Sequence, residues 1–313
     1  MAASSPLQPA PSKLAVVAAF AAVYVIWGST YLAIRIAVTS VPPFLSAGAR
    51  FLIAGALAYV WLRARGHPSP TRPEWRAAAV VGLLLLLGGN GLVSWAEMRI
   101  SSGAAALLVA FVPIWIVLLD RRRHGRPPGI LVLALAGGLL GIVILIGPDQ
   151  LAGAGRVDIV GAAAVLLATI SWAVGSLHSR HATLPPSPFM ATAAEMLTGG
   201  AGLLAVSVLT GELIDFNPAG IPREALAAIA YLVVFGSFVA LSAYVWLLRV
   251  QPTERVATYA YVNPVVAVLL GAVVLGEPLT PRVIVASAII VASVGLIVSM
   301  PHMARRAARR HET

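Results

Sequence analysis

The chain has 313 residues, of which 59% are hydrophobic and 11% charged, with a mean hydropathy of +0.90. A soluble domain carries roughly 25% charged residues, so this composition excludes a soluble globular protein and indicates a membrane protein. The absence of cysteine excludes a disulfide framework and a thiolate metal site. The net charge of +10 would suit nucleic acid, but most arginines fall in loops where anionic lipid is a sufficient partner, so we expect no nucleic-acid role.

The apolar runs predict an all-α integral membrane protein with ten transmembrane helices, because a helical span needs about 20 apolar residues. Residues 1–13 are rich in Pro and Ser and are predicted to be disordered, without a signal-peptide cleavage site. Turn-forming Pro and Gly residues separate the spans. The predicted spans are 14–37, 44–63, 76–97, 102–119, 129–147, 159–179, 188–209, 224–248, 255–275 and 283–299.

The loops between these spans differ in charge from one side of the membrane to the other. One alternating set of loops and termini holds sixteen Lys and Arg residues, whereas the other set holds five. Positively charged loops stay in the cytoplasm. We therefore predict a multi-pass protein of the inner (plasma) membrane with both termini in the cytoplasm.

The stretch from Trp27 to Ala56 recurs 145 positions later. Ten of its thirty ungapped positions are identical in the second copy, where roughly three are expected by chance in so Ala- and Leu-rich a chain. The one conspicuous exchange is Arg50 for Glu195. Because the repeat unit contains five spans, an odd number, the second copy is predicted to be inverted, as in alternating-access carriers. The predicted organisation is a first repeat over 14–147, an extracytoplasmic linker over 148–158, a second repeat over 159–299 and a basic cytoplasmic tail over 300–313.

Arg50 and Glu195 are the two charges placed well inside predicted spans. At about 1.5 Å per residue, Arg50 lies roughly 10 Å below the outer boundary, and Glu195 mirrors it from the inner face. Charged side chains inside a membrane are costly and therefore invite a functional hypothesis. Each either forms a structural ion pair or lines a cavity and meets substrate charge; Arg50 could also snorkel to the headgroups, and Glu195 is a candidate carrier of a coupling proton.

Polar residues in the first and third spans are further candidates for a cavity wall. Asn90 and Ser94 share one helix face, and Trp95 follows near the outer end of the span. Glu97 is expected at the outer interface with Arg99. Candidates elsewhere in the repeated stretch are Trp27, Ser29, Thr30 and Trp172, of which the two hydroxyls either line the cavity or only pack helices closely.

Pro113 and Pro264 lie at matching repeat positions inside the fourth and ninth predicted spans. Proline frees the carbonyl four residues earlier, and matching interruptions in two halves point to a binding site between them, with the prolines as hinges. Tyr259 and Asn263 add aromatic and hydrogen-bonding groups beside the second proline. Tyr244, near the inner end of the eighth span, is assigned together with Trp246 to the interfacial aromatic belt.

The fifth and tenth predicted spans are almost free of polar side chains, which predicts lipid-facing helices or a dimer surface. Gly137 and Gly141 form a pair of small residues that suits a homodimer contact. The six histidines fall in loops, at a span end or in the tail, so neither a metal site nor a cofactor is expected.

An ordered set of short motifs is distributed across the two repeats. These are Trp27-Gly28-Ser29, Pro43-Phe44 with Arg50-Phe51, Trp95-Ala96 through Ser102, Ala104-Ala105-Ala106, Pro113, Ala260 to Pro264, and Gly276-Glu277-Pro278-Leu279. In this order they resemble the ten-span EamA family of the drug/metabolite transporter superfamily over about residues 14–300. The resemblance implies a central cavity lined by spans one, three, four, six, eight and nine. The first repeat departs from the pattern with Arg126 before Pro127, so no symmetric role for Glu277 follows.

We therefore expect a secondary transporter that exports small metabolites, amino-acid-like compounds or drugs by rocking its two repeats about a midplane site. A proton is the candidate coupling ion, and the small-molecule substrate and the lipid bilayer are the expected partners. A lipid-linked metabolite flippase is the alternative within transport. An integral membrane enzyme is a third reading, for which His178 and His181 with Glu195 are the nearest, weakly supported candidates.

Overall fold

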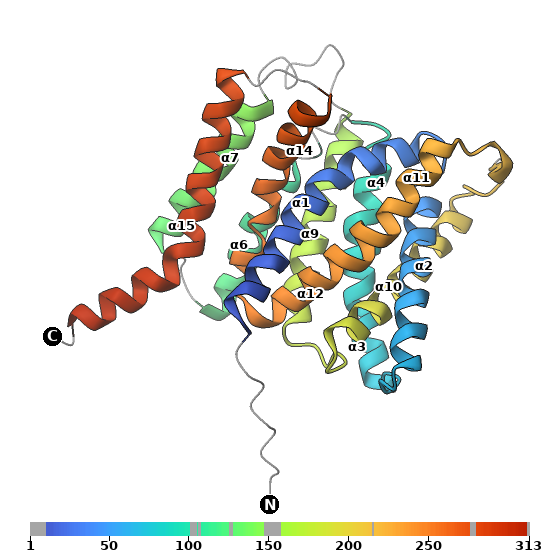
Figure 1. Cartoon of the computed structure of the whole chain (residues 1–313), viewed down its shortest axis with the longest axis horizontal. Helices are drawn as coiled ribbons and strands as arrows, with labels where there is room; N and C mark the ends of the chain where they lie inside the picture. The colour runs from blue at the N-terminus through green and yellow to red at the C-terminus, as the bar shows by residue number, and fades with distance from the viewer. Residues whose placement is uncertain are drawn as a thin grey trace, which may run out of the picture.

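The computed structural model describes residues 11–100, 105, 108–124, 128–146, 158–214, 216–275 and 280–311, and these residues form helices joined by turns, without a strand (Figure 1). The first half of the chain contains α1 (Lys13–Val38), α2 (Pro43–Ala64), α3 (Arg72–Gly82), the π-helical η1 (Leu83–Gly91), α4 (Leu92–Ala96), α6 (Val112–His124) and α7 (Gly129–Ile146). The second half contains α9 (Ile159–Ser179), α10 (Pro188–Leu209), the 3₁₀ turn η2 (Pro218–Gly220), α11 (Arg223–Tyr231), the π-helical η3 (Leu232–Ala240), α12 (Leu241–Val250), α13 (Thr253–Val256), α14 (Tyr259–Leu275) and α15 (Pro281–His311).

Side chains at the helix starts explain why the long helices begin where they do. The Ser12 hydroxyl accepts from the Ala15 amide at the start of α1, and the Asp158 carboxylate does the same for Gly161 in α9. Thr71 and Glu74 form a reciprocal capping box that begins α3. Each cap satisfies a backbone N–H that the first helical turn leaves without a partner.

Six helical segments of the described residues are long and apolar enough to cross a membrane, which confirms an all-α integral membrane protein. They are Lys13–Val38, Pro43–Ala64, Arg72–Ala96, Ile159–Ser179, Pro188–Leu209 and Arg223–Val250. Of the other four predicted spans, 102–119 and 129–147 fall partly outside the described residues, whereas α14 covers most of 255–275 and α15 contains 283–299. Shorter apolar helices over Gly129–Gly141 and Ile284–Ile297 lie within two of the four. Residues 1–10, the linker residues 148–157 and the motif at Gly276–Leu279 also lie outside the described residues.

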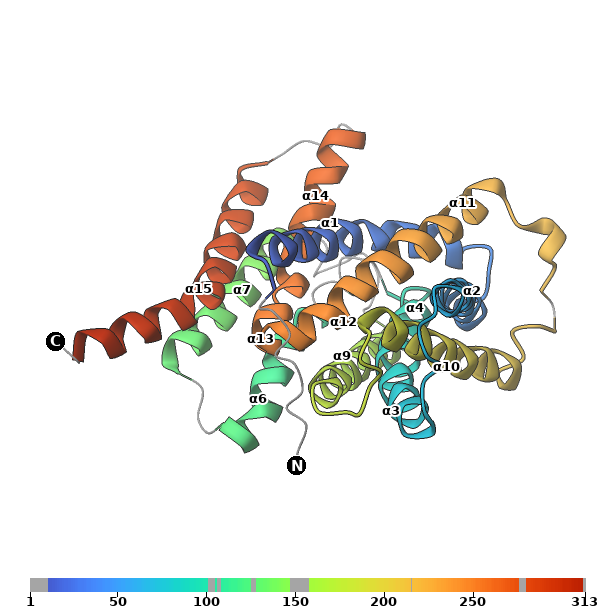
Figure 2. The same ribbon diagram turned by 60° about the horizontal axis from the view of Figure 1, so that its bottom comes forward.

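The helices form a central bundle with one peripheral pair. In both views α7 and α15 lie side by side at one edge, and α14 connects them to α1 (Figures 1 and 2). The contact between α7 and α15 involves Gly137 and Gly141, which were expected at a homodimer contact. A Cβ added to Gly137 would lie 2.8 Å from the Ser293 hydroxyl, and one added to Gly141 would lie 2.7 Å from Ile290. These glycines therefore allow α7 and α15 of the same chain to approach closely, and they give no support to a dimer surface.

The third and eighth predicted spans each contain a π-helical stretch of 9 residues, η1 and η3. In a π-helix the hydrogen bonds run from i to i+5, and such stretches occur often at functional sites. Side chains from neighbouring helices bond to carbonyls within both stretches. Ser171 donates to the Leu84 carbonyl at 2.8 Å, and the Trp27 indole donates to the Gly236 carbonyl at 3.2 Å.

The two prolines do not occupy equivalent positions in the helices. Pro264 lies inside α14, as predicted, whereas α6 begins at Val112, so Pro113 belongs to its first turn. A proline in the first turn removes no helical hydrogen bond, because the N–H groups there have no intrahelical acceptor. The expected internal position of Pro113 is therefore wrong. Turns nevertheless precede both helices, at residues 110–111 and 257–258.

Candidate functional site

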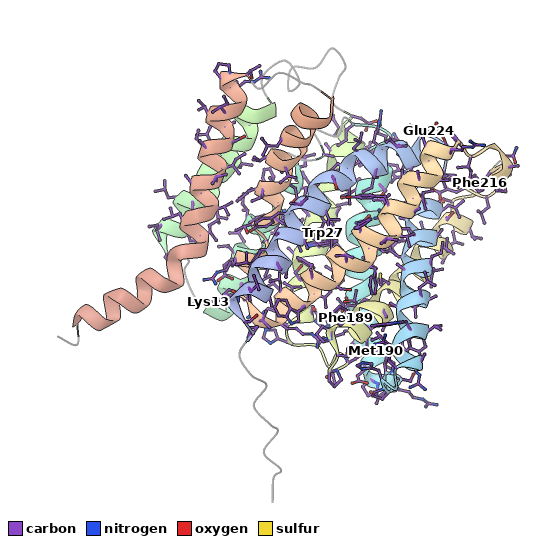
Figure 3. The ribbon with its side chains drawn as sticks, viewed as in Figure 1. Lys13, Trp27, Phe189, Met190, Phe216 and Glu224 are labelled. Atoms are coloured by element: carbon purple, nitrogen blue, oxygen red, sulfur yellow. The ribbon has the colours of Figure 1, made fainter. Side chains whose placement is uncertain are left out.

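A cavity lies inside the central bundle, between helices from both halves of the chain. Its wall includes seven of the residues expected to face a substrate: Trp27, Thr30, Arg50, Asn90, Trp172, Tyr259 and Asn263. Trp27 is at mid-height in Figure 3, where Lys13 and Glu224 lie toward opposite ends of the bundle, here called the Lys13 face and the Glu224 face. Residues Thr30 to Ile34 follow Trp27 along α1 toward the Glu224 face, so the cavity occupies that half of the protein.

Four aromatic rings from four helices close the cavity at mid-height. Trp27 of α1 meets Trp172 of α9 edge to face at 5.6 Å between centroids, and it meets Tyr259 of α14 at 4.9 Å. Tyr244 of α12 lies 5.1 Å from Trp27 and 5.4 Å from Trp172. Tilted and edge-to-face pairs at these distances are favourable, because the electropositive edge of one ring faces the electronegative face of another. We call these four residues the aromatic layer.

Tyr244 is the member of the aromatic layer that corrects an expectation. It is fully buried, not part of an interfacial belt. Its hydroxyl receives a hydrogen bond from the Trp172 indole at 2.8 Å and lies 2.5 Å from the Ser176 hydroxyl. Since these bonds satisfy the phenol inside an apolar core, Tyr244 links α12 to α9 on the side of the layer that faces away from the cavity.

Arg50 brings a positive charge into the cavity wall and does not snorkel to the headgroups. Its side chain is 4% exposed, its guanidinium donates to the Asn90 amide oxygen and it lies 4.5 Å above the Phe51 ring. The Arg50 Nε has no hydrogen-bond partner among the described residues. Of the described residues that line the cavity, Arg50 alone carries a charge. The described protein groups therefore hold the guanidinium in place but leave its Nε–H free to donate a hydrogen bond.

The carboxyl group of Glu97 lies inside the bundle near Arg50, not at the interface where the sequence predicts it. Its side chain is 0% exposed, and it interacts electrostatically with both Arg35 and Arg50. Arg35 donates a hydrogen bond to the Glu97 backbone carbonyl, whereas both carboxylate oxygens lack a hydrogen-bond partner in the described part of the chain. Glu97 is thus a buried carboxyl group, not an interfacial partner of Arg99.

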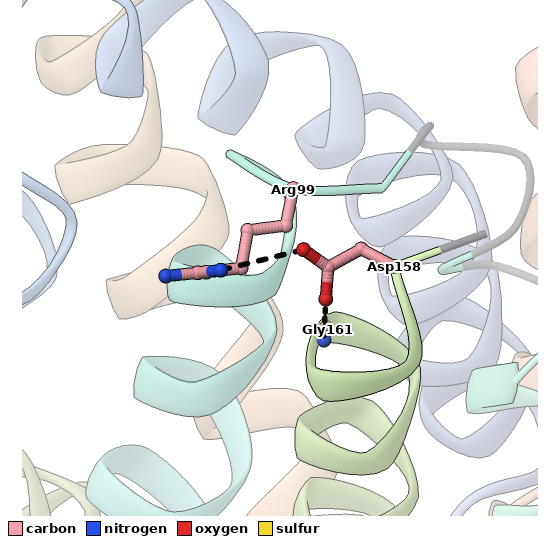
Figure 4. Close-up of polar contacts among 3 residues, drawn as sticks. All are labelled: Arg99, Asp158 and Gly161. Atoms are coloured by element: carbon pink, nitrogen blue, oxygen red, sulfur yellow. Dashed lines mark hydrogen bonds and ion pairs between the residues drawn. The ribbon is translucent and has the colours of Figure 1, made fainter. Parts of the chain in front are cut away.

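Arg99 pairs instead with Asp158 at the Glu224 face, at 3.3 Å between Nη1 and Oδ2 (Figure 4). The second carboxylate oxygen of Asp158 accepts from the Gly161 amide at 2.8 Å. This backbone hydrogen bond is the largest cause of a lowered pKa for Asp158, and the Arg99 guanidinium lowers the pKa further. The pair joins the end of the third predicted span to the start of α9.

Asn263 connects two aromatic residues across the cavity wall. Its amide nitrogen donates to the Tyr259 carbonyl at 3.0 Å and to the Tyr24 carbonyl at 3.2 Å. Its side chain also bonds the hydroxyl of Tyr31, which lines the cavity and was not predicted from the sequence. Thr169 is a second addition, and its hydroxyl accepts from the Trp115 indole at 3.0 Å. Tyr31 lies on the same face of α1 as Trp27, and Thr169 lies on the same face of α9 as Trp172.

Four candidate residues lie outside the cavity wall. Ser29 bonds the Ile26 carbonyl and the Tyr231 hydroxyl, each at 2.6 Å, and Ser94 is buried without lining the cavity. Trp95 lines a separate groove at the Glu224 face. Glu195 is 1% exposed on α10, on the far side of the aromatic layer. Substrate contact remains a prediction for every residue of the set.

The described residues hold no group of three or more His, Cys, Asp or Glu side chains that could bind a metal ion. An internal cavity between helices of both halves of the chain is the kind of site that secondary transporters use. The profile of the EamA-like transporter family matches residues 13–147 and again 159–299. The chain therefore belongs to this family.

Relatives in three domains of life share most of the chain. The inner membrane transporter YedA of Escherichia coli strain K12, whose activity is uncharacterized, is 41% identical over 277 residues, covering 88% of each chain. An uncharacterized transporter of Archaeoglobus fulgidus is 23% identical over 87% of this chain and 94% of its own length. The WAT1-related protein At3g02690 of Arabidopsis thaliana is 25% identical over 87% of this chain and 66% of its own length.

Among solved structures, a crystal structure of another protein matches the fold with a TM-score of 0.73 over 92% of this chain and 98% of the other. At 23% identity this likeness shows the fold alone. Together with the named relatives, the family membership makes the protein a membrane transporter.

Proposed function

We propose that the protein is a secondary transporter that exports small amino-acid-like metabolites or drugs across the inner membrane by alternating access. The observation that carries the proposal is the cavity between the two family-matched halves, with Arg50 at its wall and the aromatic layer at its base. The name of the Escherichia coli relative supports the inner membrane as the location.

Two inverted repeats of five spans each, with both termini in the cytoplasm, are the architecture that we propose. The family profile matches twice, and the repeat-equivalent Trp27 and Trp172 touch edge to face. Contact between equivalent residues is expected where a two-fold axis in the membrane plane passes between two halves. The π-helical stretches η1 and η3, one in each half, support the same relation. In this orientation the Lys13 face is cytoplasmic and the cavity belongs to the outer half.

The chemistry of the cavity favours a small solute with a carboxylate and an apolar body. Arg50 and Asn90 present N–H donors, and a guanidinium binds a carboxylate through strong, charge-assisted hydrogen bonds. The aromatic layer offers ring faces and edges to an apolar group. The free volume of about 90 Å³ exceeds the roughly 10–15 Å³ that a single water requires, which suits a small solute better than a lipid-linked one.

A proton is the coupling ion that we favour. Two buried carboxylates, Glu195 and Glu97, lie on opposite sides of the aromatic layer, and neither has a hydrogen-bond partner among the described residues. A carboxylate that protonates in one state and ionises in the other can exchange a proton for a solute.

Flux in proteoliposomes tests the proposal. Purified protein should move a carboxylate-bearing solute from a panel of amino acids and small drugs, and an imposed pH gradient should drive its accumulation. Glu195→Gln should abolish the pH dependence, with normal insertion checked by its elution profile in detergent. Failure of every solute to move, with or without the gradient, would contradict the proposed function; unchanged pH dependence in Glu195→Gln would remove Glu195 from the coupling step.

A further inference from the structure

Glu195 has a buried carboxyl group that the cavity leaves unexplained. It lies on α10 toward the Lys13 face, 1% exposed, and its two carboxylate oxygens have no hydrogen-bond partner within the described residues. The surrounding packing is tight, because a Cβ added to Gly82 of α3 would lie only 2.4 Å from the Glu195 carbonyl. Buried polar groups are nearly always bonded, so an exception of this kind calls for a cause.

The repeat relates Glu195 and its neighbours to the wall of the cavity. At the offset of 145 residues, Glu195 corresponds to Arg50, Trp172 to Trp27 and Ser176 to Tyr31. Arg50, Trp27 and Tyr31 all line the cavity on the Glu224 side. If the halves exchange roles, as the proposed function requires, then Glu195, Trp172 and Ser176 line an equivalent cavity on the Lys13 side.

Specific bonds close that second cavity in this state. Tyr244 joins Trp172 and Ser176 through its hydroxyl. Nearer the Lys13 face, Arg249 donates to the carbonyls of Pro185 and Pro186 at 3.0 and 2.8 Å. Opening of the second cavity would require these bonds to break, and the side chains would then gain contact with water.

The donor and acceptor chemistry of this second site is opposite to that of the first. Glu195 is an acceptor-only group when ionised, whereas the guanidinium of Arg50 only donates. Arg249 and Tyr244 are the charged or titratable groups that interact electrostatically with Glu195. A carboxylate suits a primary ammonium, whereas the guanidinium of Arg50 suits a carboxylate.

We propose that Glu195 forms a cytoplasm-facing substrate site for the ammonium group of an amino-acid-like solute, and that this site exists only when the Lys13 side is open. This inference rests on the proposed function. The two ends of one zwitterion are then recognised in different states: the ammonium by Glu195 during loading and the carboxylate by Arg50 before release.

Cysteine accessibility tests the opening, because the chain has no native cysteine to remove. Glu195→Cys and Ser176→Cys in inside-out vesicles should react with a membrane-impermeant thiol reagent at least tenfold faster than Ala193→Cys. Ala193 is equally buried on the same helix but corresponds to Gly48, which does not line the cavity. Ser176→Cys is nearly isosteric and keeps the test valid if Glu195→Cys fails to fold. Reaction of the two site cysteines no faster than that of the control would overturn the proposal.

A matched set of solutes tests the ammonium. Phenylalanine, its cationic amide and its anionic N-acetyl derivative differ only in the charged ends. Glu195→Gln should reduce efflux of phenylalanine and the amide at least tenfold relative to the N-acetyl derivative. Arg50→Gln should instead reduce efflux of phenylalanine and the N-acetyl derivative relative to the amide, which has no carboxylate. Equal losses for all three in Glu195→Gln would overturn the ammonium site while leaving transport intact. If the wild type moves neither these three nor any other solute of the panel, the proposed function fails, whereas labelling at positions 195 and 176 still decides whether the second cavity opens.

Discussion

Arg50 and Glu195 occupy equivalent positions in the repeated sequence, yet their surroundings differ. Arg50 lines a cavity, bonds Asn90 and has Glu97 nearby, whereas Glu195 is enclosed by packed helices and has no described hydrogen-bond partner. The aromatic layer separates the two environments. Because local sequence is so similar, the difference comes from the conformation of the whole bundle, which is open on one side of the layer and closed on the other.

The largest effect should follow from removing the charge on the open side. Arg50→Ala should lower transport of a carboxylate-bearing solute by about 10- to 150-fold, because a hydrogen bond to a charged group is worth about 1.5–3 kcal/mol. Transport of a cationic solute should fall much less, as initial rates in proteoliposomes will measure. Arg50→Lys is the control that keeps the charge. Equal loss for anionic and cationic solutes would assign Arg50 a folding role.

Adding a side chain to the wall of the cavity, on the open side of the aromatic layer, should have the next largest effect. A Cβ added to Gly89 would lie 2.6 Å from the Trp172 ring, so Gly89→Ala must displace the aromatic layer. Overpacking of this kind costs about 1–3 kcal/mol. We expect a lower melting temperature in detergent and slower flux. Gly129→Ala is the matched control, since no atom lies within 4 Å of its added Cβ, and equal behaviour of the two variants would contradict the packing described here.

Weakening the closed side should have a smaller effect. Tyr244→Phe removes the hydroxyl that bonds Trp172 and Ser176, at a cost of about 1 kcal/mol per bond. We expect a modest loss of thermal stability together with faster labelling of Ser176→Cys from the Lys13 side. Tyr59→Phe loses an exposed bond to Ser69 and serves as control. Slower labelling in Tyr244→Phe would show that the hydroxyl does not hold this side closed.

The smallest effect should come from Asp158 at the Glu224 face. Its pKa is lowered in the folded protein, so its stabilising contribution is present above the unfolded value of about 3.9 and is lost as pH falls through the lower folded value. The melting temperature of Asp158→Asn should therefore lie slightly below that of the wild type by a constant amount from about pH 7 to 5. The two should converge below about pH 4; a gap that persists in acid would point to the cap geometry rather than the charge.

Residue patterns anticipated the membrane class and the residues of the cavity wall better than the partners of those residues. Trp27, Arg50 and Asn90 were found because polar or aromatic groups are conspicuous inside apolar helices. Glu97 was misplaced although the third span ends at Ala96, one residue from its predicted end, because the sequence does not reveal that Arg35 and Arg50 of two other helices lie near it. Gly137 was misread since a small-residue pair indicates close helix contact but not whether the partner helix belongs to the same chain.

The aromatic layer could not have been predicted from sequence spacing. Its rings come from α1, α9, α12 and α14, which are distant in the sequence, and Tyr244 is close enough to a span end to resemble an interfacial residue. Only the packing of the helices reveals that its hydroxyl finds buried partners. The prediction that Pro113 lies inside a helix was wrong for a related reason: a turn at residues 110–111 precedes a new helix that begins at Val112.

Blocking the cavity tests the central claim, that substrate passes through it, most directly. Thr30→Cys lies in the cavity wall, and Leu32→Cys lies two residues away on the same helix at a position that is 60% exposed on the bundle surface. Treatment with a bulky, membrane-impermeant thiol reagent should stop flux through reconstituted Thr30→Cys, and it should leave Leu32→Cys and the cysteine-free wild type unchanged. Full flux through Thr30→Cys after complete modification would contradict the account.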